Sequence, residues 1–114
     1  MIKYQIEVSE PAEIDMDNAF YHLLLRAPKS ATMLRDGLAE SLRSLSEMPN
    51  RCGLAPETGQ LDRPIRQLLY RHGKATYRIL FLAFESVEDS PALVRVVRVL
   101  HGSQQSLISP ADEE

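Results

Sequence analysis

The chain has 114 residues, of which 44% are hydrophobic and 25% charged, and this length suits one domain around one core. Its longest wholly apolar run, Ile79–Phe84, is far shorter than the roughly 20 residues that cross a bilayer, and the first residues lack an apolar signal region. The single cysteine, Cys52, excludes an internal disulfide. We therefore expect no membrane association and a reducing, cytoplasmic location.

The formal net charge of −3 is unevenly distributed along the chain. Between residues 63 and 105, seven lysines and arginines stand against three carboxylates, a local net charge of +4, so the remaining residues carry −7. A negative total argues against a protein that coats nucleic acid over its whole surface. The cationic segment indicates either one localised anionic partner or charges that are paired within the fold.

Residues 2–8 alternate between apolar and polar side chains, which is the period of a half-buried strand. Ser9 is then placed to cap a helix whose first turn tolerates Pro11. We expect Pro28 to end this helix. Its apolar residues fall at helical spacing and form one stripe: Met16, Ala19, Phe20, Leu23, Leu24 and Ala27.

A second amphipathic helix is predicted from near Ser30 until Pro49 stops it, with Gly37 tolerated at some cost. Its stripe comprises Ala31, Leu34, Leu38, Leu42, Leu45 and Met48. The two predicted helices follow one another closely and each has one apolar face to bury. They are therefore expected to form a helical hairpin.

The segment 49–64 is rich in Pro, Gly and polar residues and predicts a loop. Three strands are predicted after it, at 65–71, 75–84 and 92–101, and their short connections favour antiparallel pairing. The expected fold is therefore α+β, with an N-terminal strand, a helical hairpin and three antiparallel strands packed on the two helices. We expect residues 1–108 to form the domain and residues 109–114 a short acidic tail.

Arginines lie within all three of the C-terminal predicted strands, and a sheet covered by helices on one side has a second face to which they can point. Strict alternation would place Arg95 and Arg98 on opposite sides of the last strand. One of them should then be structural, and alternation alone does not say which.

Several segments in order carry a resemblance to a known family: YQIEVSEPAEID, NRCGLAPE, IRQLLYR, YRILF and VRVLHG. Together they resemble toxins of the RelE/ParE superfamily, the plasmid stabilisation proteins of bacterial type II toxin–antitoxin systems. The resemblance implies this α+β fold, growth inhibition, and silencing by a cognate antitoxin that wraps the toxin. It also implies either a homodimer or a toxin–antitoxin hetero-oligomer.

Two toxic mechanisms occur in the superfamily, and whether this chain is an enzyme stays open at this point. Some members cleave ribosome-bound mRNA, and the resemblance then implies catalytic positions at Arg71, Tyr77, Arg78 and His101. ParE members instead poison DNA gyrase without catalysis. Here Gly102 to Gln104 supply no basic or aromatic residue after the last strand, which disfavours the nuclease. The VRVLHG ending resembles the ParE side of the superfamily and favours a ParE-like gyrase poison, although ParE members also often have a basic residue after the glycine. The alternatives are a ribosome-dependent mRNA endonuclease and a degenerate, non-toxic binding module.

Arginines are also the candidates for binding an acidic partner, because the guanidinium is always charged and bonds carboxylates in pairs. The candidate partner-binding residues are Arg66, Arg71, Arg78 and Arg98. The competing hypothesis is that Arg66 and Arg78 pair internally with Glu57, Asp62 or a helix carboxylate, and that His101 is structural. The histidines and Cys52 have no recognisable ligand spacing, so we expect no metal and no cofactor.

Overall fold

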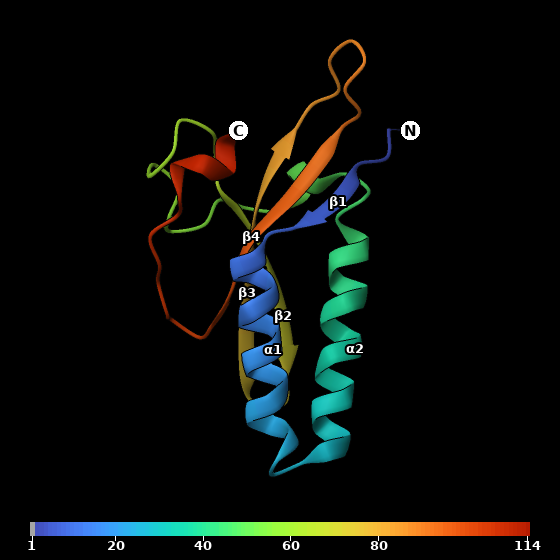
Figure 1. Ribbon diagram of the computed structural model, residues 1–114, viewed down its shortest axis with the longest axis vertical. Helices are drawn as coiled ribbons and strands as arrows, with labels where there is room; N and C mark the ends of the chain where they lie inside the picture. Colours follow the sequence, from blue (N-terminus) through green and yellow to red (C-terminus); the bar gives the residue numbers. More distant parts are fainter. Residues whose placement is uncertain (1) are drawn as a thin grey trace.

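The computed structural model describes residues 2–114, and Figure 1 shows a twisted sheet with a helical hairpin on one side. The order of strands and helices is the predicted one. The elements are β1 (Gln5–Val8), α1 (Glu10–Leu24), α2 (Pro28–Ser44), a 3₁₀ helix (Pro49–Arg51), β2 (Arg66–His72), β3 (Ala75–Phe84), β4 (Leu93–His101) and a second 3₁₀ helix (Pro110–Glu113). Within residues 2–114 no helix is long and apolar enough to span a membrane.

The sheet has the strand order β1-β4-β3-β2, so β2 and β1 are its two edges. The predicted antiparallel pairing of β2 with β3 and of β3 with β4 is confirmed. Strand β1 lies parallel to β4, with Gln5 opposite Leu93 and Val8 opposite Val96. The chain leaves β1 directly into α1, so this pairing fixes the start of the hairpin beside the middle of β4.

The predicted cap of the first helix is confirmed, because the Ser9 hydroxyl accepts a hydrogen bond from the Ala12 amide at 3.3 Å. The prediction for Pro28 was wrong. Helix α1 already ends at Leu24, and Pro28 is the first residue of α2. Proline suits that position because the first helical amides have no partner within the helix and its fixed φ already matches the helix.

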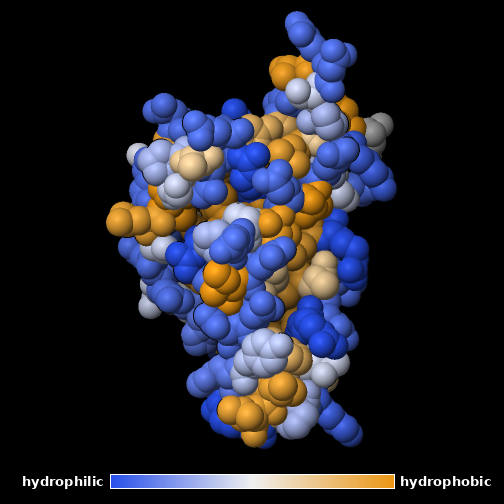
Figure 2. All heavy atoms as spheres, in the orientation of Figure 1, coloured by the Kyte–Doolittle hydropathy of each residue, from blue (hydrophilic) through white to orange (hydrophobic). Residues whose placement is uncertain are grey.

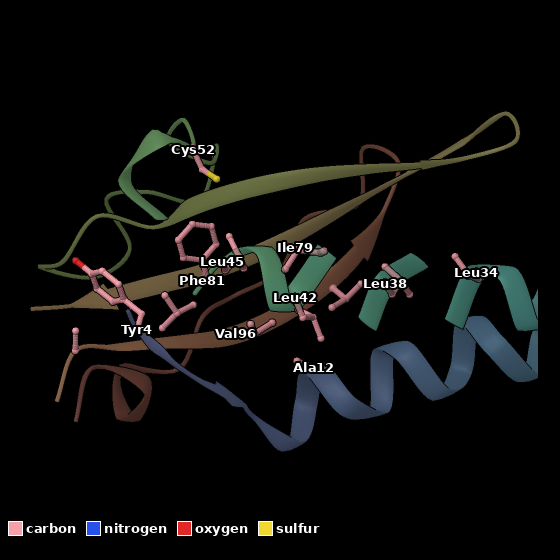
Figure 3. Close-up of a cluster of buried hydrophobic side chains, with 13 residues drawn as sticks. Tyr4, Ala12, Leu34, Leu38, Leu42, Leu45, Cys52, Ile79, Phe81 and Val96 are labelled. Atoms are coloured by element: carbon pink, nitrogen blue, oxygen red, sulfur yellow. The ribbon is translucent and has the colours of Figure 1, made fainter. Parts of the chain in front are cut away.

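The main hydrophobic core lies between the helices and one face of the sheet. Figure 3 shows Leu38 and Leu42 of α2 and Val96 of β4 among its side chains, with Phe81 of β3 nearby. The predicted apolar stripe of the second helix is confirmed for five residues that are all buried: Ala31, Leu34, Leu38, Leu42 and Leu45. Met48 does not belong to it, because α2 ends at Ser44 and Met48 has left-handed backbone torsions with a side chain that is 62% exposed.

The second face of the sheet is not open along its two central strands. Residues of the 52–65 loop and of the C-terminal segment cover that face and form a second core with both central strands. The unbroken apolar run Ile79–Leu82 agrees with this arrangement, since a strand buried on both faces does not alternate with polar residues. The second core contains Ala55, Leu61, Ile65 and Ile108 from the covering segments, and Leu80, Leu82, Val97 and Leu100 from β3 and β4.

Strict alternation also fails in β4, because a β-bulge at Val97 shifts the register against β3. Leu82 lies opposite Arg95 and Leu80 lies opposite Arg98, and both leucines belong to the second core. Residues directly opposite in a ladder share a face. Arg95 and Arg98 are therefore on the same side of the sheet, and the extra residue of the bulge is the reason.

Candidate functional site

A groove with a volume of about 750 Å³ lies at the end of the sheet where β2 turns into β3. Its walls come from α1 and the turn after it, the start of α2, the β2–β3 turn, and the end of β4 with the residues that follow it. In Figure 1 these segments meet at the lower end of the molecule. The groove brings together two of the predicted catalytic residues, Tyr77 and His101.

Tyr77 and His101 are opposite one another in the ladder of β3 and β4, and their ring centroids are 5.1 Å apart at an angle of 56°. The Tyr77 ring is half-buried, while His101 at the strand end is exposed. Burial raises the pKa of the Tyr77 hydroxyl above its ordinary value. The hydroxyl therefore stays protonated near neutral pH and is available as a hydrogen-bond donor.

Arg78, the third predicted catalytic residue, is buried on the other face of β3. Its Nη1 and Nη2 atoms donate to the two carboxylate oxygens of Glu57 at 2.9 and 2.8 Å. Nη1 also donates to the Gln67 side chain at 3.0 Å, and Nη2 to the Gln104 carbonyl. The hydrogen bond to Glu57 raises the pKa of Arg78, and the same bond lowers the pKa of Glu57. The alternative that Arg78 pairs with Glu57 is confirmed.

Two further predicted arginines are also engaged inside the protein. Arg66 donates to the Cys52 carbonyl at 2.8 Å, which holds the start of β2 to the loop. Arg98 pairs with Asp15 of α1 through Nε and Nη2, both at 2.7 Å, and the same carboxylate accepts the Val99 amide at 2.9 Å. The hydrogen bond to Asp15 raises the pKa of Arg98. These contacts join β4 to α1.

Arg71 differs from the other three partner-binding candidates. Its side chain is exposed, and among residues 2–114 it has no ion pair or side-chain hydrogen bond. Arg71 lies opposite Thr76 in the ladder of β2 and β3. Thr76 is two positions before Arg78 in β3, so Arg71 and Arg78 are on the same side of the sheet. The four predicted catalytic residues are therefore divided, with Tyr77 and His101 at the groove and Arg71 and Arg78 on the second face.

The groove also contains residues that were not selected from the sequence. His22 comes from α1 and Arg26 from the α1–α2 turn, while His72 and Lys74 come from β2 and the β2–β3 turn. A sequence signal existed for the α1 wall, because Asp15, Asn18, His22 and Arg26 follow one another at helical spacing beside the apolar stripe. No group of three or more His, Cys, Asp or Glu side chains within the described part of the chain fits a metal ion.

A second, smaller groove of about 320 Å³ lies between α1 and α2 and is mainly apolar. Figure 2 shows a band of hydrophobic surface along the face of the molecule seen in Figure 1. Arg35 lies over the Phe20 ring at 5.0 Å from its centroid. Tyr21 and Met33 are 60% and 65% exposed, so the hairpin presents apolar surface to solvent. The apolar lining includes Met16, Phe20, Leu34, Leu38 and Leu42.

Comparison with known proteins agrees with the fold. Residues 6–106 match the model of a family described as the ParE toxin of type II toxin–antitoxin system, parDE. A chain of the chromosomal ParDE TA system from P. aeruginosa has a similar structure, with a TM-score of 0.63 at 16% identity. The alignment covers 86% of the present chain and 95% of that chain. No curated protein sequence matches.

Proposed function

Because the chain belongs to the ParE toxin family of type II toxin–antitoxin systems, we propose that it arrests bacterial growth by poisoning DNA gyrase without catalysis of its own. The main observation that argues against catalysis is the ion pair between Arg78 and Glu57 inside the protein. Cleavage of a phosphodiester requires a base, an acid and a cation around one phosphate. Here Arg71 and Arg78, the two arginines predicted to be catalytic, lie on a different face of the sheet from Tyr77 and His101.

A nuclease would need to release Arg78 toward its substrate, and the surroundings of Arg78 oppose this. The Glu57 side chain is only 1% exposed, so withdrawal of the guanidinium would leave a buried, unpaired carboxylate. Such a loss typically costs about 3–5 kcal/mol. The mRNA endonuclease therefore remains the second candidate, supported by the adjacent Tyr77 and His101 alone.

We also propose that a cognate antitoxin neutralises the protein and that the complex is a hetero-oligomer. The apolar groove between α1 and α2 supports this, because a disordered antitoxin segment that folds on binding requires apolar anchor positions. Of the four predicted partner-binding arginines, Arg71 remains the candidate, because Arg66, Arg78 and Arg98 already bond within the protein. Arg71 would steer an acidic segment, while apolar contacts would supply most of the affinity.

The test is induced expression in bacteria, combined with a gyrase cleavage assay on the purified protein. Growth should stop, DNA cleaved by gyrase should accumulate, and translated mRNA should stay intact. His101→Ala and Tyr77→Phe should remain as toxic as the unmodified protein. Mapped mRNA cleavage that disappears in His101→Ala, with the fold retained, would instead establish the endonuclease. Normal growth with the protein present and folded would favour a non-toxic binding module.

A further inference from the structure

We propose that the groove between α1 and the β2–β3 turn binds the phosphate group of a nucleotide, either free or in a nucleic acid strand. Two cations line it from different segments, Arg26 of the α1–α2 turn and Lys74 of the β2–β3 turn. Neither has a carboxylate within ion-pair distance among residues 2–114, although five other ion pairs occur there. A protein of net charge −3 thus leaves two cations uncompensated in one groove.

The single carboxylate of the groove wall does not offset these cations. Asp15 accepts two bonds from the Arg98 guanidinium and one from the Val99 amide. Its charge is therefore already compensated, and its oxygens are turned to β4. The remaining polar side chains of the wall include the donors Ser30, Tyr77 and Gln104. A rim of donors with a positive net charge is suited to an anion.

All three histidines of the chain line this groove: His22, His72 and His101. His72 Nε2 is 2.7 Å from the Ser30 hydroxyl, and His101 lies against the Tyr77 ring. The groove therefore holds every imidazole of the chain, and a ring N–H can donate a hydrogen bond to a phosphate oxygen. The charged and titratable groups around it are Asp15, Arg26, Lys74, Tyr77 and the three histidines.

The shape of the groove favours a nucleotide over a bare anion or an acidic peptide. Its volume of about 750 Å³ lies within the usual range for small-molecule sites, roughly 300–1,000 Å³. Part of its wall is apolar, formed by Ala19, Leu23 and Val99. The Tyr77 and His101 rings give an aromatic surface on which a base can stack beside the cations. Arginine bonds phosphate oxygens bidentately, as Arg26 would here.

The experiment titrates the purified protein at low salt with ATP, inorganic phosphate, a short single-stranded oligonucleotide and a polyglutamate peptide. The groove variant is Arg26→Gln with Lys74→Gln, and the matched control is Lys3→Gln with Arg43→Gln. Both pairs consist of exposed cations and change the net charge equally, but the control pair lies at the opposite end of α2. Circular dichroism checks that both variants fold.

We expect the groove pair to weaken ATP or oligonucleotide binding by about tenfold and the control pair by less than about twofold. Tighter binding of ATP would identify a free nucleotide as the ligand, and tighter binding of the oligonucleotide a strand. The proposal is overturned by no binding, by equal losses in both variants, by equal affinity for ATP and phosphate, or by equal affinity for polyglutamate. The assay contains neither gyrase nor antitoxin, so its outcome is independent of the proposed function.

Discussion

Arg78 and Glu57 form a bidentate ion pair. It holds the second layer of the protein, which consists of the long loop and the C-terminal segment, against the sheet. Arg78 belongs to β3 and Glu57 to the long loop, and both are almost completely buried. The same guanidinium bonds Gln67 of β2 and the Gln104 carbonyl of the C-terminal segment. One arginine of β3 thus bonds to three other segments: β2, the long loop and the C-terminal segment. This position explains a cation in the middle of the sheet without reference to a substrate.

Arg78→Ala is expected to lower the free energy of unfolding by about 3–5 kcal/mol, because it leaves the Glu57 carboxylate buried and unpaired. Urea unfolding monitored by circular dichroism measures this change. Arg71→Ala is the matched control, since Arg71 is exposed on the neighbouring strand and should change stability by about 0.5 kcal/mol or less. Similar small effects for both variants would mean that the ion pair does not hold the second layer.

The same pair should make stability depend on pH. The hydrogen bond from Arg78 holds the pKa of Glu57 below its ordinary value of 4.5. A carboxylate with a lowered folded pKa contributes fully above its unfolded pKa, and the contribution is lost as the pH falls through the folded value. The difference in unfolding free energy between the unmodified protein and Glu57→Gln should therefore be constant above about pH 6 and shrink below about pH 4.5. A difference that stays constant down to pH 3 would refute this assignment.

Asp112 should give stability the opposite dependence on pH. Burial is the main cause that raises its pKa. Its contribution to stability is therefore present at low pH and is lost as the pH rises through the folded pKa. Comparison of Asp112→Asn with the unmodified protein over the same pH series separates this effect from that of Glu57.

Asp15→Ala should destabilise the protein by about 2–3 kcal/mol, because Asp15 bonds both the Arg98 guanidinium and the Val99 amide. The Asp15 side chain is only 13% exposed, so water does not readily replace these bonds. Asp17→Ala on the same helix is the control, because Asp17 is exposed and no hydrogen bond joins it to the sheet. Thermal unfolding should place Asp15→Ala clearly below Asp17→Ala.

Arg71→Glu should slow association with the proposed antitoxin, since Arg71 is the predicted partner-binding cation that has no ion pair among residues 2–114. Rim charges mainly change the association rate and its salt dependence. Arg43→Glu, an exposed residue near the end of α2, is the charge-matched control. Surface plasmon resonance at several salt concentrations gives both quantities. If the two variants associate equally fast, then Arg71 has no part in docking.

Local patterns predicted most of the fold, because its elements are set by periodicity and capping. Ser9 caps α1 as expected, and β3 has the predicted bounds of Ala75 and Phe84. The missing features depend on contacts between distant segments. The apolar residues of the long loop, such as Leu61 and Ile65, are too few and too scattered to form a pattern, yet they pack on the second face of the two central strands. The bulge at Val97 is likewise set by pairing with β3 and by packing.

The site was only partly predictable for the same reason. Tyr77 and His101 are 24 positions apart, and the ladder of β3 and β4 brings them together as neighbours. Sequence reasoning identified both, but not His22 or Lys74, which reach the same groove from other elements. The family resemblance pointed to arginines, and the structure shows that Arg78 and Arg98 have carboxylate partners inside the protein. Such pairing becomes visible only when the loop and α1 are placed against the sheet.

The close approach of Gly37 and Tyr70 gives a last prediction, on how α2 is seated against β2. A Cβ atom added at Gly37 would lie 1.8 Å from the Tyr70 hydroxyl oxygen and 2.3 Å from the ring carbon that carries it. Tyr70 packs against the main core, so its ring cannot move aside freely. Alanine favours helix over glycine by about 1 kcal/mol, but overpacking costs about 1–3 kcal/mol. Gly37→Ala should therefore destabilise the protein.

A double-mutant cycle with Tyr70→Ala tests this explanation, because removal of the ring also removes the clash. In the Tyr70→Ala background, Gly37→Ala should become stabilising by up to about 1 kcal/mol, a reversal of sign that helix propensity alone cannot produce. Tyr70→Phe should not reverse the sign, since the ring carbons remain within 2.8 Å of the added Cβ. Gly53→Ala is the matched control, because a Cβ there meets nothing within 4 Å. If Gly37→Ala has the same effect with and without the Tyr70 ring, the glycine is not what lets β2 pack against α2.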